Sequence, residues 1–178
     1  VDGSTNVLIG QNAGGSLITG SNNVAIGGQS MSSTTASSNV GVGYGSLKTN
    51  VSGSNLVAIG SEALCNNNAY NNIAIGAIAS QGNTTGIYNI ALGVCTMRLN
   101  TTGSCNVFLG SRSGYGNTTG CFNTAVGHCA LRDNASNHYS TAVGYQAGCG
   151  NTGAYNAIFG ANAGYAGSSG PCNAYIGY

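Results

Sequence analysis

Hydrophobic and polar positions recur along this chain in one short motif. It consists of Asn or Ser, an apolar or Thr residue, a further apolar residue, a large apolar residue and then Gly. The motif ends at Gly10, Gly27, Gly43, Gly60, Gly76, Gly93, Gly110, Gly127, Gly144, Gly160 and Gly177. Successive glycines are 16 or 17 residues apart. So short and regular a period is typical of stacked coils, each of which packs only against its neighbours.

Each motif predicts a short β-strand. The residue before the Gly is large and apolar in every coil, and the residue two places earlier is mostly β-branched, which suits a strand. Because residues two apart share one face of a strand, we expect both to point into the coil. The residue three places after the Gly is small in all ten complete coils, which predicts a tight second wall facing the strand.

The predicted fold is therefore a single-domain, all-β parallel solenoid (a β-roll) of about eleven coils over residues 1–178. No linker or shift in composition divides it. One coil is irregular, because Leu56 takes the usual Asn position after Asn55, and we expect a bulge there. Both ends are expected to be uncapped, since the first motif begins at Asn6 and Tyr178 directly follows the last Gly. Open ends predict end-to-end stacking or further repeats.

A column of Asn residues opens the strands. Stacked Asn side chains can bond to one another along the axis, and Asn tolerates the left-handed backbone of a corner. The expected structural ladder comprises Asn6, Asn23, Asn39, Asn72, Asn89, Asn106, Asn123, Asn156 and Asn173.

A second Asn column, seven residues after each Gly, marks the opposite corner. Five of its members satisfy the N-glycosylation pattern: Asn50, Asn83, Asn100, Asn117 and Asn134. Coils stack about 4.8 Å apart, so branched glycans on every coil would collide. We expect the corner role to prevail, with glycosylation as the alternative.

The charge content excludes several classes of function. Charged residues are 4% of the chain, with a net charge of +1, which removes the basic cluster that nucleic acids or anionic membranes require. No run of apolar residues is long enough for membrane insertion. Asp2, Glu62 and Asp133 occupy different coils and different repeat positions, so no paired carboxylates are expected. We predict no enzyme activity and no cofactor.

The seven Cys residues contain no CxxC motif, so no metal site is predicted. Cys105 and Cys121 lie in successive coils at nearly equivalent places, which makes them the candidate disulfide. The other Cys residues are interpreted as small apolar fillers or as links between chains.

If the two large strand residues point inward, the residue between them points outward. That column is almost entirely apolar, which predicts a face covered by another chain. The expected inter-chain face comprises Ala25, Ala58, Ala74, Ala91, Phe108, Ala125 and Ala142. The alternative is that another segment of the same chain covers these residues.

The motifs NVAIG at 23–27, NIAIG at 72–76 and NTAVG at 123–127 resemble the NSVAIG repeat of YadA-like heads. These are the adhesive heads of bacterial trimeric autotransporters, and phage tail fibres carry similar repeats. The resemblance implies a left-handed roll, a trimer, and a location outside the cell, on the cell surface or on a virion.

We therefore expect a non-catalytic structural segment of an extracellular adhesive fibre. Its expected partners are copies of itself, side by side and end to end, and a host surface or glycan. The alternative is a surface-binding solenoid that contacts ice or glycan through its Thr/Asn corner. Thr pairs align there on three coils, at 84–85, 101–102 and 118–119. Adjacent Thr residues on a strand point to opposite faces, however, which disfavours a flat Thr array.

Overall fold

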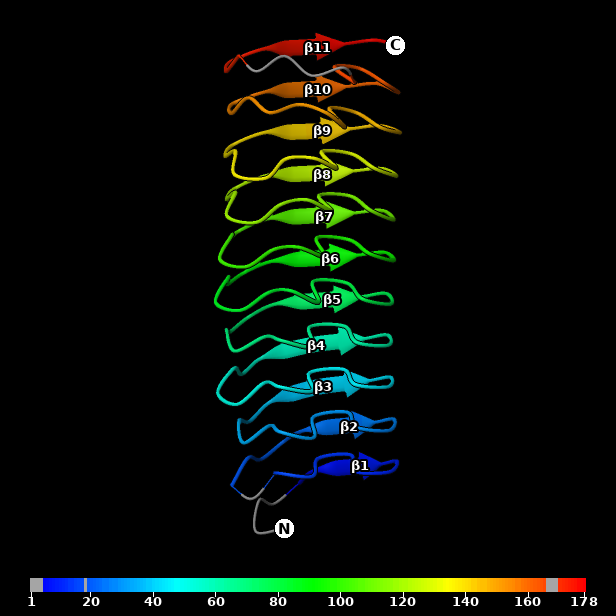
Figure 1. Ribbon diagram of the computed structural model, residues 1–178, viewed down its shortest axis with the longest axis vertical. Helices are drawn as coiled ribbons and strands as arrows, with labels where there is room; N and C mark the ends of the chain where they lie inside the picture. Colours follow the sequence, from blue (N-terminus) through cyan, green and yellow to red (C-terminus); the bar gives the residue numbers. More distant parts are fainter. Residues whose placement is uncertain (1–4, 18, 166–169) are drawn as a thin grey trace.

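The computed structural model describes residues 5–17, 19–165 and 170–178, and these form a single column of stacked coils (Figure 1). Each coil contributes one short strand, and all neighbouring strands pair in parallel and in chain order. The strands are β1 (Val7–Ile9), β2 (Val24–Ile26), β3 (Asn39–Val42), β4 (Leu56–Ile59), β5 (Ile73–Ile75), β6 (Ile90–Leu92), β7 (Val107–Leu109), β8 (Thr124–Val126), β9 (Thr141–Val143), β10 (Ala157–Phe159) and β11 (Ala174–Ile176). The predicted all-β parallel solenoid is confirmed.

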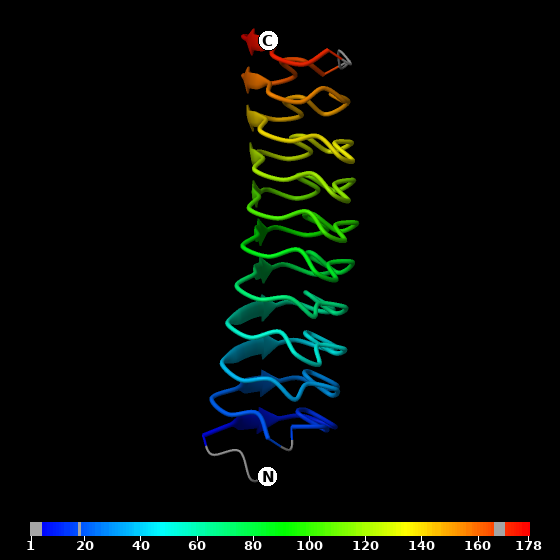
Figure 2. The same ribbon diagram turned by 90° about the vertical axis from the view of Figure 1, so that its left-hand side faces the viewer.

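The other half of each coil is a return segment, the stretch from the Gly to the residue seven places later. In the coil of Gly60, Ala63 N donates to Gly60 O at 3.3 Å and Cys65 N donates to Glu62 O at 3.3 Å, so Glu62 and Leu64 are each the third residue of a turn. Glu62 and Leu64 have φ of 55° and 48°. A left-handed residue in the third place of a turn is what type II turns require. The return segment is therefore a chain of tight turns that lies behind the strand as a second layer (Figure 2).

Alternate N–H groups of the return segment bond between coils. Glu62 N donates to Tyr44 O of the previous coil at 2.8 Å, whereas Leu64 N donates to Ala79 O of the following coil at 3.0 Å. Buried backbone donors need such partners. The second layer is thus hydrogen-bonded along the axis without forming a strand.

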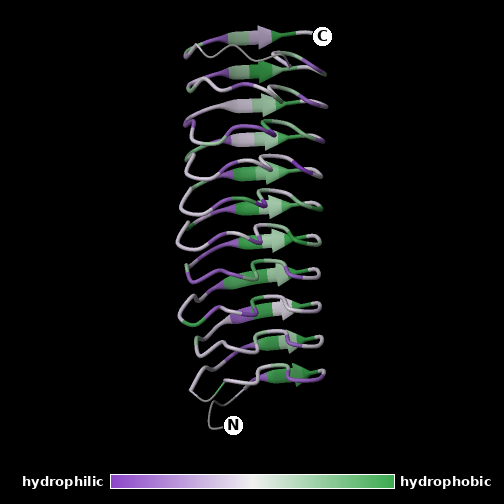
Figure 3. Ribbon diagram, viewed as in Figure 1, coloured by the Kyte–Doolittle hydropathy of each residue, from purple (hydrophilic) through white to green (hydrophobic). Residues whose placement is uncertain are grey.

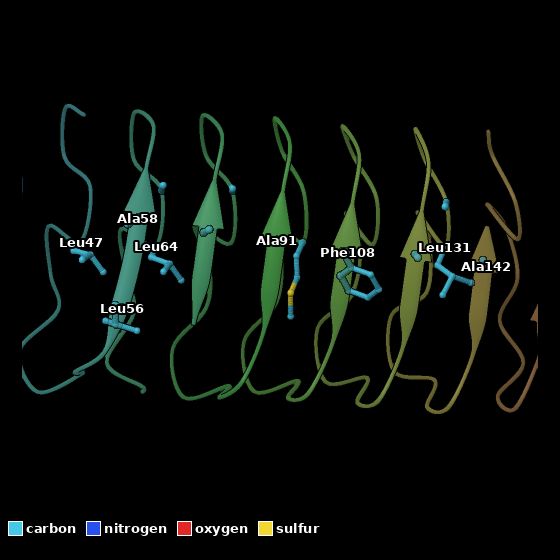
Figure 4. Packing of buried hydrophobic residues seen from close by; sticks show 14 of the residues in the cluster. Leu47, Leu56, Ala58, Leu64, Ala91, Phe108, Leu131 and Ala142 are labelled. Atoms are coloured by element: carbon cyan, nitrogen blue, oxygen red, sulfur yellow. The ribbon is translucent and has the colours of Figure 1, made fainter. Parts of the chain in front are cut away.

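The core between the two layers holds about one large side chain per coil. In most coils it is either the strand residue two before the Gly or the return residue four after it. Small Ala58 on β4 is paired with Leu64, whereas large Phe108 on β7 is paired with Gly114. Figure 4 shows Leu64, Phe108 and Leu131 in this space between the layers. The small column three places after each Gly is also largely buried, as at Ala130.

The predicted direction of the strand side chains is wrong. The expected inter-chain face, Ala25, Ala58, Ala74, Ala91, Phe108, Ala125 and Ala142, has 0% exposure. Return segments of the same chain cover it, as the alternative stated. The large residues on either side point outward instead; Ile75, for example, remains 39% exposed. The space between the layers is narrow, because a Cβ added to Gly41 on β3 would already meet Ser30 Oγ at 2.9 Å.

The expected bulge is also absent. Leu56 pairs in register with Asn39, and its backbone N donates to Asn39 Oδ1 at 3.1 Å, as an Asn at this position would. Leu56 simply replaces Asn and is buried. Within the described residues, no helix is long and apolar enough to cross a membrane.

Candidate functional site

The outward side chains of β2 to β10 form a mostly apolar surface, which we call the sheet face. Its members are Val24, Ile26, Val40, Val42, Val57, Ile59, Ile73, Ile75, Ile90, Leu92, Val107, Leu109, Thr124, Val126, Thr141, Val143, Ala157 and Phe159. All are half-buried or exposed, and none is charged. Apolar residues follow one another up the strands of this layer (Figure 3).

The sheet face repeats with the coils. Its side chains stack in register, as Ile73 on Ile90 and Ile75 on Leu92. Parallel sheets are normally covered on both faces. A contiguous apolar surface of this kind marks an interaction site on soluble proteins.

The Asn residues that open the strands form the predicted column, with a different hydrogen-bond pattern. Asn106 Oδ1 accepts from the backbone N of Asn123 in the next coil at 3.0 Å. Its Nδ2 donates to the backbone O of Gly120 at 2.8 Å. The same amide-to-backbone link joins Asn6 to Asn23 at 2.8 Å and Asn156 to Asn173 at 2.8 Å. Asn23, Asn39, Asn72, Asn89 and Asn123 also accept from the following coil. Each Asn of the column from Asn6 to Asn156 therefore accepts a hydrogen bond from the backbone of the next coil and ties the two coils together.

In the first column Asn106 Nδ2 also donates to Asn89 Oδ1 at 3.1 Å. The second Asn column has a continuous series of such amide-to-amide bonds. Asn83 Nδ2 donates to Asn67 Oδ1 at 2.6 Å, and Asn100 Nδ2 donates to Asn83 Oδ1 at 2.6 Å. Asn117 continues the series, donating to Asn100 Oδ1 at 2.8 Å. This ladder runs inside the corner, shielded from solvent.

The corner role expected for Asn50, Asn83, Asn100, Asn117 and Asn134 agrees with their burial, and the alternative of glycosylation finds no exposed acceptor in the folded chain. All five residues are at most 1% exposed. The nitrogen that would carry the sugar is buried in every case, and in Asn50, Asn83, Asn100 and Asn117 it also donates inside the corner. A glycan at these positions would need the corner to open.

The Thr pairs lie at this same corner, outside any strand. Thr84 Oγ1 donates to the backbone O of Thr101 at 2.9 Å, and Thr101 Oγ1 donates to that of Thr118 at 3.1 Å. The first hydroxyl of each pair is therefore used to join coils. Only the second members, such as Thr102, present an uncommitted hydroxyl at the surface.

All seven Cys residues are free thiols, and the candidate Cys105–Cys121 disulfide is not formed. Cys121 stacks on Ser104 rather than on Cys105, and its Sγ accepts from Ser104 N at 3.2 Å. The two Cys residues lie five and six places before their glycines. Because the coils stack in register, that offset of one residue places Cys121 above Ser104 and not above Cys105.

These environments predict the order in which the thiols are alkylated in the native protein. Exposed Cys172 should react first. Burial raises the pKa of the Cys65 and Cys149 thiols, so less of the reactive thiolate is present at pH 8 and both should react slowly. Mass spectrometry after timed iodoacetamide treatment checks this, and a denatured control should show seven modified thiols. Rapid labelling of Cys149 in the native protein would contradict it.

Sequence reasoning missed a column of exposed aromatic rings five residues before the glycines. Phe122, Tyr139 and Tyr155 stack with centroid distances of 5.0 and 5.1 Å. All three have left-handed backbone, with φ between 57° and 59°. The sequence does show an aromatic residue five places before the Gly in these coils. Bulky residues are uncommon in left-handed backbone, however, so the column is not expected from residue type alone.

A scan against protein-family models found no match, and searches of curated proteins and of solved structures found no similar protein. Within the described residues, no group of three or more His, Cys, Asp or Glu side chains could hold a metal ion. The functional conclusion therefore depends on the surfaces themselves.

Proposed function

We propose that this chain is a structural segment of an extracellular adhesive fibre, in which copies associate side by side through the sheet face. The observation that supports this most is the sheet face itself: a long, uncharged, half-exposed apolar surface on a chain of few charges. Burying such a surface gives about 25 cal/mol for each Å² of apolar area removed from water.

A second copy of the chain is the occupant that fits this surface best. The sheet face repeats at the strand spacing of about 4.8 Å. Only a surface with the same repeat can place its side chains between the side chains of successive strands along the whole sheet face. Another copy of the chain necessarily has that repeat. By the resemblance to YadA-like heads, the proposed assembly is a trimer at a cell or virion surface.

The ends of the column support growth along the axis. The outer edges of β1 and β11 pair with no other strand among the described residues. Unpaired strand edges favour pairing with another strand. In the proposed fibre, further coils or the end of another copy would continue the sheet there.

The proposal is tested by placing charges on the sheet face. The double variant Ile75→Lys/Leu92→Lys puts two ammonium groups on adjacent coils. Both side chains point outward, so the coil should fold, but desolvating unpaired charges in an apolar interface costs several kcal/mol. We expect the parent chain to sediment as an oligomer at micromolar concentration and the variant as a monomer with unchanged far-UV circular dichroism.

Thr85→Lys is the matched control, because Thr85 is exposed at the corner and away from the sheet face. It should keep the oligomer. A parent chain that is a folded monomer, or a double variant that assembles as well as the parent, would refute lateral association.

A further inference from the structure

The few cationic side chains of this chain are concentrated in one place on the return segments. The protein has four Lys and Arg residues in 178. Three of them, Arg98, Arg112 and Arg132, line a single open hollow of about 320 Å³. Cys95, Tyr115 and Asp133 complete its wall. The hollow spans three successive coils of the return segments. These segments form the layer behind the strands (Figure 2), so covering the sheet face leaves the hollow open to solvent.

Two of the arginines are held in position by neighbouring side chains. Arg98 Nε donates to Gln81 Oε1 at 3.2 Å, and its Nη1 donates to Tyr115 Oη at 3.4 Å. Arg132 forms a bidentate pair with Asp133, with distances of 2.9 and 2.7 Å. The guanidinium groups of Arg98 and Arg132 are therefore fixed two coils apart, roughly 10 Å at the strand spacing.

Arg112 differs from both. Its side chain is exposed, and within the described residues its guanidinium makes no hydrogen bond or ion pair. It lies on the coil between Arg98 and Arg132. The hollow has three guanidinium groups and one carboxylate, so its net charge is positive. The guanidinium of Arg112 is a planar donor that remains available to a ligand. Such a donor suits a planar or tetrahedral oxyanion.

We propose that this hollow binds an acidic sugar residue, with Arg112 and Arg98 holding its carboxylate or sulfate group. Asp133 and Tyr115 then face the sugar hydroxyls. A carboxylate oxygen keeps lone pairs beyond those used by Arg132, so Asp133 can accept from a hydroxyl. The aromatic ring of Tyr115 adds an apolar surface for the sugar.

The composition of the wall distinguishes this ligand from a polyanion of phosphates. Nucleic acid binding needs many cations along a path, and only Lys48 lies elsewhere on the chain. Asp133 would repel a second anionic group brought close to it, whereas it binds the hydroxyls of a sugar. A ligand that combines one oxyanion with several hydroxyls fits both features.

Titration calorimetry on the intact chain tests the site, in whatever state of assembly it adopts. The probes are a carboxylated polysaccharide, a sulfated polysaccharide, uncharged dextran and inorganic polyphosphate, each of similar length. Arg112→Gln removes the uncommitted guanidinium, and Lys48→Gln removes an equal charge from a distant coil.

We expect one or both acidic polysaccharides to bind, with affinity that falls between 50 and 200 mM salt, and dextran not to bind. Arg112→Gln should weaken binding about tenfold or more, the worth of a charge-assisted bidentate contact, and Lys48→Gln should leave it unchanged. Whichever of the carboxylated and sulfated polysaccharides binds more tightly identifies the acidic group that the hollow recognises. Equal losses in both variants, binding of dextran, tighter binding of polyphosphate, or no binding of either acid would overturn the proposal. Lateral assembly is read separately by sedimentation, so failure of one proposal does not affect the other.

Discussion

Replacing Phe108 with Ala is expected to lower the free energy of unfolding by about 3–5 kcal/mol, the usual cost of removing a buried aromatic ring. Phe108 is fully buried and is the large core side chain of its coil. Its ring occupies the position that the return segment fills elsewhere. A built Cβ on Gly114 would meet Phe108 Cζ at 2.8 Å, so nothing else in the coil can expand into the space while the ring is present.

A second substitution should restore much of the loss. Other coils carry Ala on the strand and Leu four residues after the Gly, as with Ala58 and Leu64. Gly114 has a φ of 56°, close to the 48° of Leu64 and the 47° of Leu131, so a Leu can adopt the backbone found there. Phe108→Ala/Gly114→Leu should therefore be more stable than Phe108→Ala alone.

Urea unfolding of the two single variants and the double variant measures this coupling. Gly114→Leu alone should be destabilising, because Leu and Phe108 would occupy the same volume. The two substitutions should therefore be strongly non-additive and favourable together. Additive losses would show that the two columns do not share one core position.

Gly110→Ala is expected to destabilise the protein by on the order of 4 kcal/mol, combining backbone strain with overlap of atoms. Gly110 ends β7 with a φ of 126°, which L-residues rarely adopt. An added Cβ would lie 2.6 Å from the backbone O of Gly127 in the next coil. Neither backbone can retreat, because Gly127 N is hydrogen-bonded to Leu109 O at 2.8 Å.

Gly45→Ala is the matched control for this change. Gly45 also has positive φ, but its value of 64° lies in the left-handed region where Gln29 and Glu62 sit in other coils. Its added Cβ would make only ordinary contacts, with Glu62 Cγ at 3.5 Å and Lys48 Cδ at 4.0 Å. We expect a loss of about 1 kcal/mol. Thermal unfolding followed by circular dichroism compares the two variants, and a similar melting temperature for both would contradict the argument.

The repeat fixed the architecture because each coil must satisfy the same backbone constraints. A Gly recurs wherever the chain leaves a strand with φ near 130°, as at Gly60 and Gly93. Asn recurs where a side chain must accept from the backbone of the next coil, as Asn89 does from Asn106. These requirements are local and recur in every coil, so one sequence shows them without an alignment.

The corner chemistry was only partly predictable. N-x-S/T motifs at Asn83, Asn100 and Asn117 have the form of glycosylation sites, yet the amides turn inward to form a ladder. A motif records residue types but not the direction of a side chain. Similarly, Cys105 and Cys121 are close in repeat position, but stacking in register separates columns that differ by one residue.

The sequence by itself determined the period, the position of each strand and the parallel stacking, because these follow from recurring Gly, Asn and apolar positions. Only the tertiary structure decided which strand face is inside. Hydropathy favours Ile75 over Ala74 for the core, but the space behind the sheet is narrow: at Gly41, the equivalent of Ala74 on β3, even an added Cβ would meet Ser30 Oγ at 2.9 Å. The core therefore takes the small residue, and the large ones form the exposed sheet face. Stacking also gathers Arg98, Arg112 and Arg132 into one hollow. These three residues become neighbours because successive coils stack directly on one another.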